Sequence, residues 1–434
     1  MRLFGTDGIR GVAGTYPLDA STLTRIGQVI HEDLGAGVVV VGRDTRPSGR
    51  QICEQVLGML KDADVLDLGI VPTPAVACET KSRHADLGIM ITASHNPAKD
   101  NGLKFFGSDG FKISRERAKQ WEQRVAQTPE ISSRTSLSCQ TVSATHYEDL
   151  VRSHFQQDWG GLKVIFDLAH GAAVNMVPRV CRSIGLDAQY LAGSRDGERI
   201  NAGVGALHPH KLAEQVLSQR ADVGFAFDGD ADRLVVVDRH GNCVPGDVVM
   251  YILAQCYVRE GKNLDRLFGT VLSGQGLEDA LRGMNIALER TPVGDQHILD
   301  GLRSTGALFG GEPSGHLIQM DLLPAGDGLL AALRILRHLT QDSDLIVKAR
   351  QAVPSYPTYE SNIQVNHKPD IHDVPALRDL AMTIERALDG TGRWVLRYSG
   401  TEPLLRVFAE TKNMDTVKPM LDSFCRIAKE VLNG

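Results

Sequence analysis

One short pattern recurs three times along the chain, and it constrains the fold more than any other feature. A short apolar run leads into a polar loop at residues 85–97, at 221–233 and, more faintly, at 306–316. The first two copies open alike, with Ala-Asp, an apolar residue and Gly, followed by three apolar residues. Self-similar segments indicate repeated structural units. We therefore expect three related units, in each of which a short buried strand ends in a polar loop.

The apolar pattern between these copies is typical of an α/β protein. Strand-like runs at residues 38–41, 162–166 and 268–272 alternate with stretches of helical period, such as residues 50–60. Continuous apolar runs of this length, separated by amphipathic helices, indicate buried and largely parallel strands. Ligands of such sheets bind at the carboxyl ends of the strands. The three repeated loops are therefore expected to meet in one cleft.

The length of the chain predicts several domains. A chain of 434 residues is too long for a single hydrophobic core. We expect three α/β domains over residues 1–153, 154–250 and 251–357, and a smaller α+β domain over 358–434. Two prolines at residues 354 and 357 mark the last boundary, because proline interrupts regular structure. The polar residues 128–145 are expected to form an excursion late in the first domain.

Composition and charge argue against several classes of protein. The net charge of -6 disfavours a broad nucleic-acid surface, and no run approaches the roughly 20 apolar residues of a membrane span. The first eight residues have no apolar core, so we expect no signal peptide. Seven scattered cysteines without a C-x-x-C pair are typical of reduced thiols. We expect a cytoplasmic monomer or homodimer that binds neither nucleic acid nor membrane.

The second repeated loop predicts a metal site. Asp228, Asp230 and Asp232 alternate at period two, so an extended backbone would point all three carboxylates the same way. Three such carboxylates repel one another unless a cation lies among them, and oxygen ligands favour Mg²⁺ or Ca²⁺. An EF-hand is disfavoured because Arg233 and Arg239 stand where it needs Gly and Glu. Three carboxylates leave room for a phosphate oxygen, which favours Mg²⁺ and phosphoryl transfer. The alternative is a solvated acidic turn.

The first repeated loop presents a candidate nucleophile. Ser94 follows a strand-like run, and Pro97 disfavours helix at the residue before it. A serine needs a base or a metal to become a nucleophile. On this loop alone, an ordinary turn serine is the more favoured interpretation.

The third loop and the tail carry groups suited to binding. Glu312, Ser314 and His316 can hydrogen-bond to hydroxyl groups such as those of a sugar, and His316 can also move a proton. Residues 397–403 and Arg406 combine arginine forks, hydroxyls and a Gly turn, which suit a phosphate. The alternatives are a Gly-rich turn and a β-turn with surface arginines.

Five segments together resemble a known family. In chain order they read Gly-Thr-Asp-Gly-Ile-Arg-Gly at 5–11, Thr-Ala-Ser-His-Asn-Pro at 92–97, Asp-Gly-Asp-Ala-Asp-Arg at 228–233, Gly-Glu-Pro-Ser-Gly-His at 311–316 and Arg-Tyr-Ser-Gly-Thr-Glu-Pro at 397–403. They are similar to the signature loops of the α-D-phosphohexomutases, over nearly the whole chain. The resemblance implies four domains, of which three are related α/β units and the fourth is small.

The resemblance also implies a mechanism. Ser94 matches the serine that carries a phosphoryl group, and one Mg²⁺ per chain would be held by that group with Asp228, Asp230 and Asp232. The phosphoserine would donate to a sugar monophosphate and give a bound 1,6-bisphosphate, whose other phosphate returns to Ser94. A hexosamine 1,6-bisphosphate would then serve as intermediate and activator.

The remaining roles are implied residue by residue. Lys104 matches a general acid/base position, and four residues match supporting catalytic positions: Arg10, His95, Arg233 and His316. Glu312 and Ser314 would read the sugar hydroxyls, and Asp295 would contribute to substrate binding. The phosphate that does not react would be held by Arg397, Ser399, Gly400, Thr401 and Arg406.

Within the family, residues 2–11, 291–295 and 326–328 are most similar to bacterial members that interconvert glucosamine 6-phosphate and glucosamine 1-phosphate. That activity would supply UDP-N-acetylglucosamine and cell-wall synthesis. The chain departs from this subgroup at Pro313, residues 203–208, Gln296 and Ala325. Three alternatives stay open: the same chemistry on mannose or glucose phosphates, a metal-dependent phosphatase, and a sugar-phosphate-binding protein without catalysis.

Overall fold

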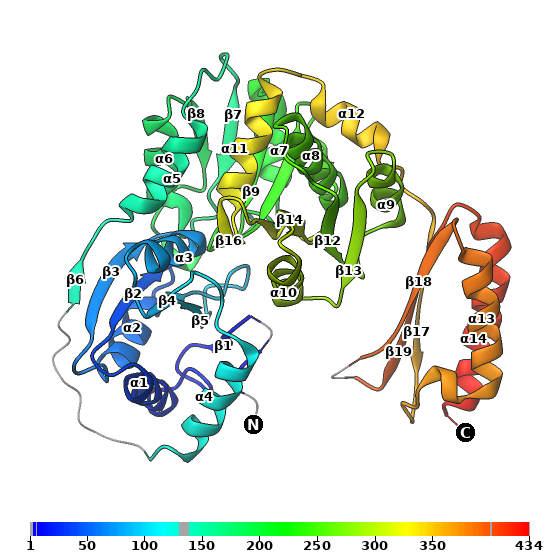
Figure 1. The fold of residues 1–434 in the computed structure, drawn as a ribbon, viewed down its shortest axis with the longest axis horizontal. Coiled ribbons are helices and arrows are strands. Elements are labelled where there is room, and N and C mark those ends of the chain that lie inside the picture. Colours follow the sequence, from blue (N-terminus) through cyan, green and yellow to red (C-terminus); the bar gives the residue numbers. More distant parts are fainter. Residues whose placement is uncertain (1–2, 6, 130–138, 400–401, 434) are drawn as a thin grey trace. The chain divides into compact units, whose positions relative to one another are not determined.

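The computed structural model describes residues 3–5, 7–129, 139–399 and 402–433. The chain forms two compact units (Figure 1). Unit 1 contains residues 1–270 and 288–350, and unit 2 contains residues 271–287 and 351–434. Across the part of the chain described, no helix is both long and apolar enough to cross a membrane.

The first sheet of unit 1 has six strands in the order β1-β5-β4-β2-β3-β6. β2 contains four consecutive valines, whose branched side chains favour a buried strand. β2, β3, β4 and β6 run parallel, and β5 pairs antiparallel with both β4 and β1. The bounds are β1 (Ile9–Val12), β2 (Val38–Arg43), β3 (Asp64–Ile70), β4 (Leu87–Ile91), β5 (Asp100–Gly107) and β6 (Cys139–Thr141).

The other two sheets of unit 1 have five strands each. Their orders are β11-β10-β9-β7-β8 and β13-β12-β14-β15-β16. The bounds in the second sheet are β7 (Val164–Asp167), β8 (Ala188–Leu191), β9 (Val223–Phe227), β10 (Leu234–Asp238) and β11 (Cys243–Val244). Those in the third are β12 (Arg266–Thr270), β13 (Ala287–Thr291), β14 (Phe309–Gly311), β15 (Leu317–Gln319) and β16 (Leu323–Gly326).

All three sheets share one local plan. β4, β9 and β14 each pair parallel with one neighbour and antiparallel with the strand that follows next in the chain. Each of the three repeated loops connects such a pair of strands: β4 to β5, β9 to β10 and β14 to β15. The prediction of three related α/β units is therefore confirmed.

The helices of unit 1 connect these strands. Several begin at a side-chain cap: Asp19 accepts the Thr22 N–H before α1, and Asp327 accepts the Leu330 N–H before α11. The bounds are α1 (Ala20–Leu34), α2 (Gly49–Leu57), α3 (Thr73–Ser82), α4 (Arg115–Gln127), α5 (Thr145–Phe155), α6 (Ala173–Ser183), η1 (Gly197–Arg199), α7 (His210–Gln219), α8 (Gly246–Arg259), α10 (Asp295–Thr305), α11 (Gly328–Leu339) and α12 (Leu345–Ala352).

Unit 2 is a three-stranded antiparallel sheet with helices on one face (Figure 1). Its core joins inward side chains of the sheet, such as Leu405 and Val407, to Leu377 and Phe424 of the helices. The segment α9 (Gln275–Arg282) also belongs to this unit, where the Gln275 N–H donates to Glu410 at 3.0 Å. The other elements are β17 (Thr358–Gln364), η2 (Ile371–Asp373), α13 (Pro375–Leu388), β18 (Gly392–Tyr398), β19 (Leu404–Thr411) and α14 (Met414–Val431).

The predicted domain boundaries meet the elements in different ways. The boundaries at 153/154 and 250/251 fall inside α5 and α8, whereas the boundary at 357/358 meets the start of β17. Of the polar excursion at 128–145, residues 130–138 lie outside the described residues, and β6 pairs with β3 at the sheet edge.

Candidate active site

The three repeated loops of unit 1 meet, as the sequence predicts. The Ser94 hydroxyl of the β4–β5 loop donates to Asp228 of the β9–β10 loop at 2.5 Å. Arg233 at the end of the β9–β10 loop forms an antiparallel bridge with His316 of the β14–β15 loop. Residues from all three related units therefore surround one site.

Ser94 occupies a constrained position. Its φ is 52°, in the left-handed region that non-Gly residues rarely adopt. The Ser94 N–H donates to the Thr92 hydroxyl at 2.9 Å, and the Ser94 oxygen lies 3.2 Å from Nδ1 of His95. The residue is only 1% exposed. The loop therefore directs Ser94 inward to the aspartates, which a simple surface turn would not do.

A buried arginine that the sequence analysis did not single out holds this loop. Arg46 pairs with Asp44 at 2.9 Å, and both side chains are fully buried. Its guanidinium also donates to four carbonyls of the Ser94 loop, those of residues 94, 96, 97 and 100. Asn201 of the second related unit donates to two of them, at 2.9 Å and 3.0 Å. The only sequence signal was that Asp44 and Arg46 follow the valine strand directly.

The aspartates converge, but not through an extended backbone. That expectation is wrong, because Ala231 has φ 58° and its N–H closes a turn onto the Asp228 carbonyl at 3.1 Å. One oxygen from each of Asp228, Asp230 and Asp232 nevertheless lies within 4.8 Å of the others, and all three residues are buried. The turn thus brings together side chains that the alternating pattern had placed on one face of a strand.

The donor set fits a hard divalent cation. Oδ1 of Asp230 and Oδ1 of Asp232 are buried without a hydrogen-bond donor among the described residues. Buried acceptors normally have partners, so two orphaned carboxylate oxygens beside a third carboxylate are suited to binding a cation. Burial and the neighbouring Asp232 and Asp230 raise the pKa of Asp228 well above its usual range. A bound cation would relieve the part of this pKa increase that comes from repulsion among the carboxylates.

Lys104 lies on β5 against the same carboxylates. Its Nζ is 2.8 Å from Asp230, 2.7 Å from Asp232 and 3.2 Å from Asp7. Burial by itself lowers the pKa of Lys104, but Asp230, Asp232 and Asp7 outweigh burial and raise it well above the usual value. Burial likewise favours neutral Asp232, yet Lys104 and His316 hold the pKa of that carboxyl well below its ordinary value. Lys104 is therefore protonated in this arrangement.

The cationic side of the site is suited to an anion. Burial, together with Arg233 and Arg10, lowers the pKa of His95 to about 4, so that its ring is neutral near pH 7. Nε of Arg10 and Nε of Arg233 are buried without an acceptor within the described parts of the chain. Two orphaned guanidinium donors of residues that line one cavity with His95 are suited to phosphate oxygens.

Two of the three residues predicted from the third loop, Glu312 and His316, line a cavity at this site, whereas Ser314 is not among its described lining residues. This cavity of about 640 Å³ is lined by Arg10, His95, Asp232, Arg233, Asp295, Glu312 and His316, among others. Glu312 accepts the Gly294 N–H at 3.2 Å and lies 3.4 Å from the Ser314 hydroxyl. Burial disfavours protonation of His316, but Asp232 and Asp295 outweigh burial and raise its pKa. Asp7 and Lys112, to which the sequence analysis gave no role, also contact this group.

The predicted phosphate-binding residues of the tail lie in unit 2. Arg397 of β18 and Arg406 of β19 are directly opposite in the antiparallel register. Like charges in that position repel, which favours an anion between them. Ser399 accepts the Glu402 N–H at 3.2 Å, and Lys368 donates to the Ser399 and Glu402 carbonyls. Gly400 and Thr401 lie outside the described residues.

Comparison with known proteins agrees with this arrangement. Models of the phosphoglucomutase/phosphomannomutase family match residues 1–132 (α/β/α domain I), 144–241 (domain II), 245–356 (domain III) and 360–427 (C-terminal domain). The chain is 37% identical over 443 residues to the phosphoglucosamine mutase of Halalkalibacterium halodurans, and the match covers 99% of each chain.

Solved structures share the fold. A phosphoglucomutase/phosphomannomutase family protein from Burkholderia thailandensis has a TM-score of 0.80 at 25% identity, covering 99% of this chain and 97% of that one. Aspergillus fumigatus N-acetylphosphoglucosamine mutase, solved with GlcNAc-6P and magnesium, has a TM-score of 0.66 at 14% identity, covering 100% and 96%. With all four domain models matched and a relative aligned over its full length, the chain belongs to the phosphoglucomutase/phosphomannomutase family of phosphosugar mutases.

Proposed function

We propose that this chain is a cytoplasmic, magnesium-dependent phosphoglucosamine mutase that works through a phosphorylated Ser94. The observation that carries the proposal is the 2.5 Å contact of the Ser94 hydroxyl with Asp228, beside two carboxylates that each have an orphaned oxygen. A serine in this position is a phosphoryl carrier next to a metal site. The full-length similarity to a curated phosphoglucosamine mutase supports the sugar.

The proposed reaction consists of two phosphoryl transfers. In the first, the bond from phosphorus to Ser94 Oγ breaks as a bond forms to the free hydroxyl oxygen of the sugar monophosphate. The sugar hydroxyl loses its proton in this step, and Ser94 Oγ gains one. In the second, the bond from the other phosphorus of the 1,6-bisphosphate to its sugar oxygen breaks as a bond forms to Ser94 Oγ. Ser94 Oγ gives up its proton, and the sugar oxygen takes up a proton. The phosphoserine is restored and the phosphate has changed position.

Charge explains why so many ionic groups surround Ser94. A phosphoserine brings about -1.5 to -2 charges to a site that already holds three aspartates. Lys104, Arg10 and Arg233 supply positive charge where the transferring group must pass, and the two orphaned guanidinium N–H groups are free to bind its oxygens. When bound, a divalent cation would add charge at the same place and offset the carboxylates that raise the pKa of Lys104.

We propose that Mg²⁺ is this cation, held by Asp228, Asp230 and Asp232 with an oxygen of the Ser94 phosphate. All the ligands are hard oxygens, and three protein ligands leave positions for phosphate. The Aspergillus N-acetylphosphoglucosamine mutase of the same fold was solved with magnesium. His95, neutral at working pH, would orient Ser94 Oγ rather than add charge.

Proton transfer and substrate binding complete the assignment. We assign Lys104 as the acid and base, because its proton is held by carboxylates that line the reacting site. Glu312 and Ser314 would bind sugar hydroxyls, with Asp295 and His316 beside them. Arg397, Ser399 and Arg406 of unit 2, with Gly400 and Thr401, would bind the phosphate that does not react.

The test is turnover of glucosamine, mannose and glucose 6-phosphates by the full chain with Mg²⁺ and a hexose bisphosphate. The proposal expects a clear preference for glucosamine. A strong preference for mannose or glucose would refute the sugar, and release of inorganic phosphate as fast as product forms would indicate a phosphatase. The substrate comparison matters because Pro313 and Gln296 depart from the subgroup beside the binding loops.

Ser94→Ala tests the phosphoryl carrier. The variant is expected to keep the fold and to lose mutase activity by at least about 10⁴-fold, because the covalent intermediate cannot form. Intact-mass measurement after incubation with the bisphosphate should show one added phosphoryl group in wild type and none in the variant. Substantial residual turnover by Ser94→Ala would contradict the role of Ser94.

A further inference from the structure

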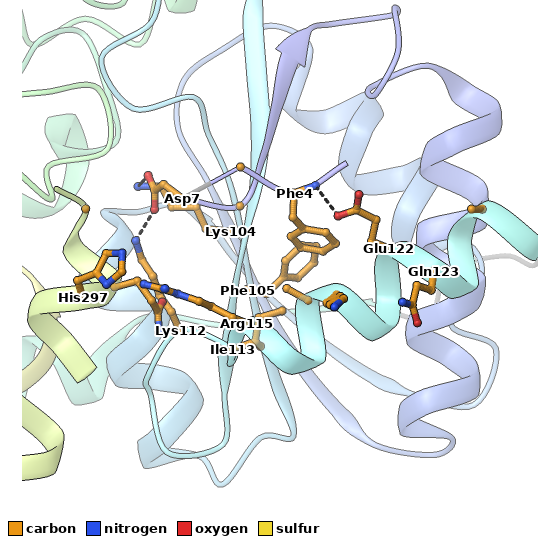
Figure 2. A pocket seen from close by; sticks show the side chains of 17 residues that line it. Phe4, Asp7, Lys104, Phe105, Lys112, Ile113, Arg115, Glu122, Gln123 and His297 are labelled. Carbon is orange, nitrogen blue, oxygen red and sulfur yellow. Dashed lines mark hydrogen bonds and ion pairs between the residues drawn. The ribbon is translucent and has the colours of Figure 1, made fainter. Parts of the chain in front are cut away.

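Lys112 makes two partly buried ion pairs that join different related units. It lies between β5 and α4, and its side chain is only 13% exposed. Its Nζ contacts Asp7 of the N-terminal segment and also Asp295, the first residue of α10. Figure 2 shows Lys112 reaching to Asp7, with His297 of α10 beside it in this view. One ammonium group thus connects the first related unit to the third.

The two contacts of Lys112 close a ring of alternating charge. From Lys112, the ring passes through Asp7 to Lys104 at 3.2 Å, and then to Asp232 at 2.7 Å. It continues to His316 at 3.7 Å, to Asp295 at 3.3 Å and back to Lys112. Every cation in this ring lies between two carboxylates, and every carboxylate lies between two cations. The ring includes both residues proposed to move protons.

Lys112 does not line the cavity that contains Glu312 and His316. The described lining of the 640 Å³ cavity includes Asp7, Asp295 and His316 but not Lys112. Lys112 instead lines a neighbouring cavity of about 730 Å³, between α4 and the start of α10. Lys104 and Asp7 line this second cavity as well. The two ion pairs of Lys112, with Asp7 and Asp295, therefore point to a positioning role.

Removing the charge of Lys112 would leave Asp7 and Asp295 facing each other. Both carboxylates contact the same Nζ, so they are within a few ångströms and would repel in a poorly hydrated place. Asp7 would keep Lys104 and Arg10, and Asp295 would keep only His316 among its described ion pairs. The repulsion would move α10 and His316 relative to Lys104.

We propose that Lys112 is a positioning residue for phosphoryl transfer, because it holds Asp7 and Asp295 together and so fixes Lys104 and His316 on either side of Asp232. This inference rests on the proposed function only in needing a phosphosugar reaction to measure. Displacements of about 1 Å at reacting groups cost on the order of 10²-fold in rate. The effect should appear in kcat more than in KM, since Lys112 is absent from the described lining of the 640 Å³ cavity.

The experiment compares five variants of the full chain with wild type, using whichever sugar phosphate wild type turns over best. Lys112→Met is expected to lower kcat about 10²-fold with KM changed less than about threefold. Lys112→Arg should recover most of this loss, because it restores the charge. The matched control is Lys119→Met, an exposed lysine of α4 that lines the same cavity, and its kcat should equal that of wild type.

The fourth variant is Asp295→Asn, and the fifth combines it with Lys112→Met. Both substitutions break the ion pair between Lys112 and Asp295, so the double variant should be no slower than the slower single variant. If the two residues had independent roles, two losses in kcat of about 10²-fold each would multiply to about 10⁴-fold. Multiplied losses, a Lys112→Met kcat within about twofold of wild type, or no recovery by arginine would each overturn the proposal. If Lys112→Met fails to fold, Lys112→Arg and Asp295→Asn carry the test.

A failure of the proposed function gives a different result. If glucosamine 6-phosphate is a poor substrate but another sugar phosphate is turned over, the Lys112 comparison still applies to that sugar. If no sugar phosphate is turned over, the rate of Ser94 phosphorylation by a hexose bisphosphate, followed by intact mass, replaces kcat. Equal loading of wild type and Lys112→Met would then refute the positioning role.

Discussion

Replacing Arg46 with methionine should show how much of the active site depends on a buried residue that has no assigned role in the reaction itself. In the structure, Arg46 has a fully buried side chain that pairs with Asp44 at 2.9 Å. It also donates to the Ser94 carbonyl at 3.0 Å and to the Asn96 carbonyl at 2.7 Å. Methionine keeps the length and apolar stem of the side chain and removes all these donors.

The size of the expected loss of stability follows from the burial of the Arg46–Asp44 ion pair. Removing one partner of a buried ion pair costs about 3–5 kcal/mol, because the other charge is left unpaired. Burial raises the pKa of Asp44, Arg46 opposes that effect, and in the variant Asp44 should take up a proton and reduce part of the loss. The left-handed conformation of Ser94 costs about 1–2 kcal/mol and would lose a main support. A shift of Ser94 Oγ by about 1 Å should lower kcat about 10²-fold.

The assays are urea unfolding, steady-state turnover and hydrogen exchange of the peptide that contains Ser94. We expect a lower unfolding midpoint, the predicted loss of kcat and faster exchange in that loop. Asn201→Ala removes two neutral donors to the same loop and should cost only about 1–3 kcal/mol. Arg50→Met, at a highly exposed pair with Glu54, should change little. Wild-type kcat and exchange in Arg46→Met would refute this reasoning.

Two further predictions concern the metal and pH. Asp230→Asn should weaken Mg²⁺ binding by more than about tenfold in calorimetric titration, since a carboxylate with an orphaned oxygen becomes a neutral amide, and unchanged affinity would contradict the metal assignment. Burial, Arg233 and Arg10 lower the pKa of His95 to about 4, below the unfolded value of about 6.5. The unfolded chain therefore binds the proton first, and stability is lost as pH falls through this window. His95→Gln should lose less unfolding midpoint between about pH 7 and about pH 5 than wild type; an equal loss would show that His95 does not contribute.

Much of the fold can be predicted from local sequence patterns. Four consecutive valines can hardly be anything but a buried strand, and β2 contains them. The repeated openings at residues 85 and 221 identify β4 and β9, and with them the loops that hold Ser94 and Asp228. These predictions succeed because strand periodicity and turn residues act over a few residues, a range in which one sequence is informative.

The same local reasoning misjudged the form of the aspartate loop. Alternation of Asp228, Asp230 and Asp232 suggested an extended strand, but Ala231 adopts a left-handed turn. The second related α/β unit packs tightly against the Ser94 loop at this point, because a Cβ on Gly229 would lie 2.4 Å from the Ser94 carbonyl oxygen. A contact with another domain, which no local pattern contains, sets the backbone of this loop.

The sequence by itself determined the α/β class and the three related units, and it placed Ser94 and the three aspartates on the repeated loops, because each of these depends on residues that are neighbours in the chain. Only the tertiary structure decided what Arg46 and Lys112 do. Ser94 meets Asp228 across 134 positions, and Lys112 meets Asp295 across 183. The physical reason is that an ion pair between distant residues depends on how whole sheets and helices pack. The sequence around a lysine does not show whether its side chain will be covered or exposed.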